Sequence, residues 1–135
     1  MKAEGRGVTL IEVLIATVIL VFASLAIIQF YFSSLRFSEL NKEEAIAQMH
    51  LTNIAEAVKC ASFSELITDF PNGVSDGTAG NSYSALVGGY TLGQEQIVVS
   101  YVNSTSDPLE VTLSLNWEDQ RGASLARYLV TKRTR

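Results

Sequence analysis

An almost wholly apolar run from Val8 to Phe32, which carries the single charge of Glu12, constrains this chain more than any other feature. The run contains neither Pro nor Gly, so it predicts an uninterrupted helix. At about 1.5 Å rise per residue this helix extends roughly 37 Å, which exceeds the roughly 30 Å hydrocarbon core of a bilayer. Because lipid offers no partners to backbone polar groups, a single segment can cross it only as a helix. The sequence therefore predicts one transmembrane helix over residues 8–32.

Residues 1–7 form a short polar leader before this run, and Lys2 and Arg6 are its cations. Positive charge beside a membrane segment favours the cytoplasmic side, so we expect a cytoplasmic N-terminus, with residues from about Ser33 onward outside. A secretory signal would instead have an apolar core of about 7–15 residues followed by a small-residue cleavage site. No such site follows Phe32, which favours a retained single-pass anchor.

Glu12 is the feature of the run that needs an explanation. A charged side chain at mid-bilayer costs on the order of 2.5–3.5 kcal/mol, although less near an interface. One interpretation is local, because Thr9-x-x-Glu12 has the spacing of a capping box, in which Thr9 caps the helix and Glu12 bonds back to the N–H of residue 9. The other is functional, because an ionisable group inside a membrane segment commonly marks a site. The residues alone leave both interpretations open.

The stretch Gly7-Val8-Thr9-Leu10-Ile11-Glu12-Val13-Leu14-Ile15-Ala16 resembles the N-terminal signature of type IV pilins and type II secretion pseudopilins, in which a short basic leader ends in Gly. The resemblance implies that a prepilin peptidase cleaves between Gly7 and Val8 and methylates the new amine of Val8. It implies that Glu12 pairs with the terminal amine of a neighbouring subunit during assembly. It also implies a bacterial inner-membrane protein with a periplasmic or extracellular C-terminal domain, later part of a pilus or pseudopilus. The usual first mature residue is Phe, so Val8 departs from the pattern.

Beyond the apolar run the sequence stays helical but becomes amphipathic. Apolar residues recur at roughly helical spacing with charged residues between them, and neither Pro nor Gly interrupts the pattern. We therefore expect one continuous helix to about Ala61, whose half over residues 33–61 needs a partner for its apolar stripe. We interpret His50 in this half as a surface or packing residue, and Cys60 as a small buried hydrophobe.

Residues 62–86 are interpreted as the connection between the helix and a sheet. Phe63–Phe70 suits a short extra turn, and the segment from Pro71 to Ser82 has loop composition throughout. Several side chains here carry the oxygen atoms that calcium prefers, but their spacing is not that of an EF-hand, so we predict no metal site. They are Asp69, Asn72, Asp76 and Asn81.

Residues 87–135 carry strand signals. The clearest segment alternates apolar and polar residues, as expected of a strand with one buried face. The β-rich segments are Tyr90–Leu92, Ile97–Val102, Glu110–Trp117 and Leu125–Thr131, the first two joined by Gly93-Gln94-Glu95. Together they predict an α+β fold, in which the long N-terminal helix packs its amphipathic half on an antiparallel sheet of about four strands. The ending around Trp117 also resembles minor pilins of the modification type and the corresponding minor pseudopilin.

Charge and composition limit the possible partners and chemistry. The formal net charge is −4, and acids dominate from Ser33 to Gln120, which argues against a broad nucleic-acid surface. Single His and Cys residues, without a nucleophile motif or phosphate-binding Gly loop, predict neither an enzyme nor a cofactor. The last fifteen residues hold only basic charges, interpreted as a solvated strand and tail. They are Arg121, Arg127, Lys132, Arg133 and Arg135.

These features favour a structural subunit, a minor pilin or pseudopilin that is cut at Gly7/Val8 and assembled through its N-terminal helix. Its expected partners are the prepilin peptidase, other pilin or pseudopilin subunits and the inner membrane. One alternative is a tip-located binding module for surfaces, DNA or secreted cargo, using loops at 71–84 and 103–108. Another is a membrane-tethered domain that never assembles, in which Glu12 is only a helix cap.

Overall fold

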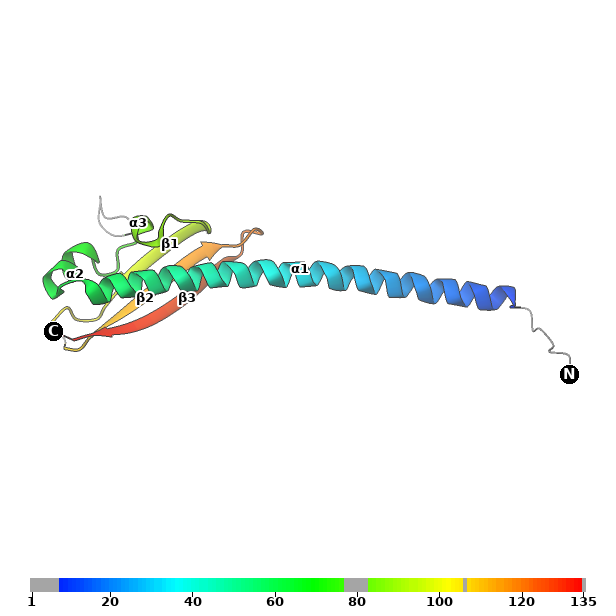
Figure 1. Ribbon diagram of the computed structural model, residues 1–135, viewed down its shortest axis with the longest axis horizontal. Helices are drawn as coiled ribbons and strands as arrows, with labels where there is room; N and C mark the ends of the chain where they lie inside the picture. Colours follow the sequence, from blue (N-terminus) through cyan, green and yellow to red (C-terminus); the bar gives the residue numbers. More distant parts are fainter. Residues whose placement is uncertain (1–7, 77–82, 106, 135) are drawn as a thin grey trace. The chain divides into compact units, whose positions relative to one another are not determined.

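The computed structural model describes residues 8–76, 83–105 and 107–134. Its elements follow the order α1, α2, α3, β1, β2, β3 along the chain (Figure 1). The chain divides into two compact units, one ending at Glu39 and the other beginning at Leu40.

The first unit holds the apolar half of α1, a helix that runs from Leu10 to Cys60. Every residue from Val8 to Glu39 is exposed. The helix is long and apolar enough to span a membrane. Hydroxyl groups within it bond to the preceding turn, since Thr17 Oγ1 donates to Val13 O at 2.7 Å. Such side chains satisfy their polar atoms inside the helix and need no outside partner.

The second unit contains a three-stranded antiparallel sheet in the order β1-β2-β3, formed by Gly93–Ser100, Leu109–Glu118 and Ser124–Arg133. The predicted α+β fold is confirmed, while the expected number of about four strands was too high. Tyr90–Leu92 is not a strand, and the expected Gly93-Gln94-Glu95 turn is the beginning of β1. The physical reason is a side chain: the Glu95 carboxylate accepts the backbone N–H groups of Thr91 and Leu92, both at 3.2 Å. Those groups are therefore not available to a strand partner.

The core lies between the inner face of the sheet and the second half of α1. The alternation predicted for the central strand is confirmed, because every second residue of β2 from Leu109 to Trp117 is buried. The helix contributes a stripe at helical spacing that comprises Ala47, His50, Leu51, Ile54, Ala55 and Val58. One hydrophobic cluster joins the two sets. The amphipathic stripe seen in the sequence is thus covered by the sheet.

The connection after α1 is more structured than its composition indicates. Helix α2, Phe63–Asp69, starts at a capping box in which Ser62 Oγ accepts from Glu65 N and the Glu65 carboxylate accepts from Ser62 N. Helix α3, Ser84–Val87, ends at Gly88 in the left-handed region with φ 80°. The Phe70 ring stacks on Tyr83 with centroids 5.8 Å apart, which fastens this connection to the core.

The two edges of the sheet differ. Residues 72–76 run beside β1, where Gly73 N donates to Val99 O and Asp76 N donates to Ile97 O, each at 2.8 Å. An isolated antiparallel bridge pairs Ser75 with Val98. The other edge is β3, which pairs with β2 in unbroken register from Leu109↔Arg133 to Glu118↔Ser124. Because the register is unbroken, Arg133 lies at the end of the sheet where β2 begins.

Candidate functional site

The candidate site predicted from the sequence lies at the first turn of α1. Thr9 caps the helix, because Glu12 N donates to Thr9 O at 3.0 Å and to Thr9 Oγ1 at 3.3 Å. Within residues 8–76, 83–105 and 107–134, the Glu12 carboxylate has neither a hydrogen-bond partner nor an ion pair. The capping box at Ser62 shows both reciprocal bonds. Only the Thr9 half of the predicted capping box is therefore formed.

The Glu12 carboxylate borders a shallow, open groove on the helix surface. The residues that line this groove are Val8, Glu12, Val13, Ala16, Thr17 and Leu20. Ala16 follows Glu12 by one turn and has only a methyl group, so space remains beside the carboxylate. The groove is mostly apolar, with one ionisable group at its edge. It could accept an apolar side chain together with a cation.

The remaining predicted site residues flank this turn. Val8 is 71% exposed and precedes the helix. Gly7 lies outside the described residues, as do Lys2 and Arg6. Val8 and Glu12 are therefore only four residues apart in the sequence, and both are exposed.

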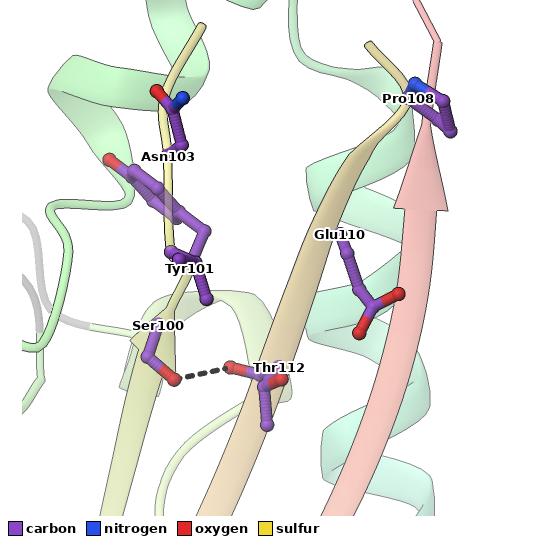
Figure 2. A pocket seen from close by; sticks show the side chains of 7 residues that line it. Ser100, Tyr101, Asn103, Pro108, Glu110 and Thr112 are labelled. Carbon is purple, nitrogen blue, oxygen red and sulfur yellow. Dashed lines mark hydrogen bonds between the residues drawn. The ribbon is translucent and has the colours of Figure 1, made fainter. Parts of the chain in front are cut away.

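A second hollow, of about 360 Å³, lies on the second unit where β1 ends and β2 begins (Figure 2). Its walls come from Ser100, Tyr101, Val102, Asn103, Pro108, Glu110 and Thr112. The Ser100 hydroxyl donates to Thr112 O at 3.3 Å, and the Glu110 carboxylate lies 3.4 Å from Lys132 Nζ. Figure 2 shows Glu110 turned toward β3, away from Tyr101 and Asn103. The hollow thus offers small polar contacts and no nucleophile paired with a base.

Two of the four side chains with calcium-type oxygen atoms, Asn72 and Asp76, hold the fold together instead. Asn72 Oδ1 accepts from Tyr101 N at 2.8 Å, and Asp76 Oδ1 accepts from the Tyr90 hydroxyl at 2.6 Å and from Ile97 N at 3.3 Å. Asn81 lies outside the described residues. No group of three or more His, Cys, Asp or Glu side chains within the described ranges could hold a metal ion.

Burial also raises the pKa values of two tyrosines in this region. Burial raises the pKa of Tyr83 to about 12. Burial and the hydrogen bond to Asp76 raise the pKa of Tyr90. Both phenols therefore stay protonated at neutral pH, and that of Tyr90 donates to Asp76.

The most buried polar contact in the second unit was not predicted. His50 Nδ1 lies 2.5 Å from Glu95 Oε1, and both side chains are almost completely buried. Glu95 Oε2 accepts from the N–H groups of Thr91 and Leu92. The carboxylate therefore joins α1, the segment before β1 and β1 itself. His50 is a packing residue, as the sequence suggested, but no local signal reveals a partner 45 residues away.

The basic end of the chain is used within the fold. Arg127 forms an ion pair with Glu44. Arg133 donates hydrogen bonds to Lys59 O and, at 2.7 Å, to Ala61 O. Arg133 thereby fastens the end of β3 to the end of α1, whereas the Arg127–Glu44 pair is about half exposed and most of β3 is exposed, in agreement with the solvated strand that the sequence indicated. Arg135 lies outside the described residues.

Cys60 is exposed, so the prediction of a buried hydrophobe was wrong. At about 100° per residue, Cys60 points roughly 200° away from the buried Val58. This rotation turns its side chain away from the sheet.

No protein-family model, curated protein or solved structure matches this chain.

Proposed function

We propose that the chain is a structural subunit, a minor pilin or pseudopilin, which is cleaved between Gly7 and Val8 and assembles through the first half of α1. The observation that carries this proposal is the Glu12 carboxylate, which borders an apolar groove on the fully exposed first half of α1 and has no partner among the described residues. A carboxylate in apolar surroundings needs a cation, since an unpaired buried charge is strongly destabilising.

The new amine of Val8 in a neighbouring subunit is the cation that the proposal assigns to Glu12. Cleavage would place this amine just before the first turn of the neighbour's own α1, with apolar residues around it. Ala16 leaves room for the neighbour beside the carboxylate. Each subunit would then offer one amine and one carboxylate, so that contacts repeat from subunit to subunit.

The cleavage step has a direct test. The full-length protein is purified from membranes with and without prepilin peptidase, and its intact mass and N-terminal sequence are measured. We expect a mature chain that starts at methylated Val8 only when the peptidase is present. A chain that begins at Met1 or Lys2 under both conditions would overturn the cleavage proposal.

The assembly role of Glu12 is tested by Glu12→Gln, which retains an amide acceptor and removes the charge. We expect membrane insertion to persist while incorporation into sheared filaments is lost. The matched control is Glu39→Gln, a change of the same type at an exposed position of the same unit, which should assemble normally. Normal assembly of Glu12→Gln would favour the tethered domain that never assembles.

A tip-located binding module is the second candidate, favoured by the hollow beside the loop at 103–108 (Figure 2). Surfaces or secreted cargo would contact this end of the sheet through Val102, which is fully exposed. The DNA version of this candidate is weakened by the contacts of Arg127, Lys132 and Arg133, because each already binds an oxygen within the fold. Binding of cargo that persists after Val102→Ser would argue against the hollow as its site.

A further inference from the structure

Phe30, Tyr31 and Phe32 are consecutive on α1 and highly exposed, at 76%, 62% and 65%. We call these three residues the aromatic girdle. On a helix, consecutive side chains point about 100° apart and differ in height by about 1.5 Å. The three rings therefore face three directions while lying within about 3 Å of one level along the axis.

This geometry distinguishes between two kinds of surroundings. A neighbouring helix covers a stripe that repeats every three or four residues, so it cannot face all three rings. A flat boundary between lipid and water meets a crossing helix on every side at one height. Tyr is also enriched at that boundary, because its ring is apolar and its hydroxyl is polar.

The residues that follow the aromatic girdle support the same boundary. No Lys or Arg occurs from Val8 to Leu35, and Arg36 is the first cation, followed directly by Phe37, which is 68% exposed. Arg36 lies about 7.5 Å beyond Tyr31 along the helix axis. An Arg at that height can place its stem along apolar surface and its guanidinium among lipid phosphates.

The distance along α1 between the aromatic girdle and Glu12 also matches a bilayer. From Glu12 to Tyr31 the helix rises about 28 Å, close to the roughly 30 Å thickness of the hydrocarbon core. We propose that the aromatic girdle seats α1 in the outer lipid headgroup boundary and thereby holds Glu12 at the inner boundary. The carboxylate then avoids the middle of the bilayer, where a charge is most costly. This inference rests on the helix crossing a bilayer and is independent of cleavage and assembly.

Depth measurements on the full-length chain test the proposal. Cys60→Ser removes the native thiol, and single nitroxide-labelled cysteines are placed at Val18 or Leu25. The protein is reconstituted in phosphatidylcholine vesicles that contain some phosphatidylglycerol. Electron paramagnetic resonance then compares collisions with oxygen and with a water-soluble nickel chelate. Val18 and Leu25 lie symmetrically about the midpoint between residues 12 and 31, so we expect equal depth. A difference of a helical turn or more would overturn the proposal.

Replacing all three residues of the aromatic girdle by Leu keeps the apolar length and removes the boundary preference. We expect the outer end to sink, so that the label at Leu25 becomes deeper than the label at Val18. Phe22→Leu is the matched control, because Phe22 is a similarly exposed ring within the span, and it should leave the two depths equal. Equal depths in the girdle variant would refute the anchoring role. A label at Ser34 that loses collisions as protein density in the vesicles rises would instead assign the girdle to a subunit contact.

Discussion

Removing either partner of the buried His50–Glu95 contact should destabilise the second unit strongly. The Glu95 carboxylate is almost fully buried and accepts from His50 Nδ1 and from two backbone N–H groups. His50→Leu keeps the volume but leaves the carboxylate with two donors and no imidazole. Breaking a buried pair in this way costs about 3–5 kcal/mol, a large part of the roughly 5–15 kcal/mol that stabilises a typical domain.

Glu95→Leu should cost at least as much as His50→Leu. It leaves the imidazole unpaired and also deprives Thr91 N and Leu92 N of their acceptor, and each buried unsatisfied group costs about 1–3 kcal/mol. The double variant should cost less than the sum of the single variants, because each single change leaves the other polar group buried and unpaired. We expect a coupling energy of about 1–3 kcal/mol.

Urea denaturation of the full-length chain in detergent micelles measures these free energies of unfolding. Trp117 is the only Trp and is buried in the sheet, so its emission reports the second unit. Met49→Leu on the exposed side of the same helix is the control, and it should change stability by less than about 0.5 kcal/mol. Free energies of unfolding for His50→Leu and Glu95→Leu that both stay within that range of the native protein would contradict a stabilising role of this contact.

Three further changes test other parts of the second unit by the same denaturation assay. Gly93→Ala should lower stability by about 1–3 kcal/mol, because its Cβ would lie 2.7 Å from Glu118 O, and an unchanged midpoint would contradict this close approach. Arg133→Ala should cost about 0.5–1.5 kcal/mol by removing hydrogen bonds to the carbonyl oxygens of Lys59 and Ala61, which water can partly replace at this partly exposed position, and Arg133→Lys should recover only part of it. Raised folded-state pKa values at Tyr83 and Tyr90 stabilise the fold fully below the unfolded pKa of about 10. That contribution should fall as pH rises toward about 12, so a flat profile above pH 10 would refute it.

Local periodicity was sufficient to predict the main elements of this fold. The expected helix end near Ala61 agrees with an end at Cys60, and the alternation of Glu110–Trp117 agrees with the burial along β2. Both patterns repeat at the period of the element that they form. A regular pattern of apolar residues therefore predicts an element wherever it persists along the element's length.

One error arises where a side chain takes over a backbone role. Tyr90–Leu92 has strand composition, but the Glu95 carboxylate takes the N–H groups of two of its residues, and β1 begins later. The pairing of His50 with Glu95 joins positions 45 apart in the sequence. Nothing in the spacing of either residue reveals the other, because the contact exists only after the helix has packed on the sheet.

The two halves of α1 differ in burial, although both are rich in apolar residues. In the half within the second unit, the sheet covers the apolar stripe from Ala47 to Val58. In the half from Val8 to Glu39, every residue is exposed. Each large apolar side chain there would gain about 1.5–3 kcal/mol on full burial. None of the described residues covers these side chains, so we expect lipid or other helices to supply this gain. Glu12 belongs to this half and has no partner among the described residues, so the experiments that assign its role must include a membrane or neighbouring subunits.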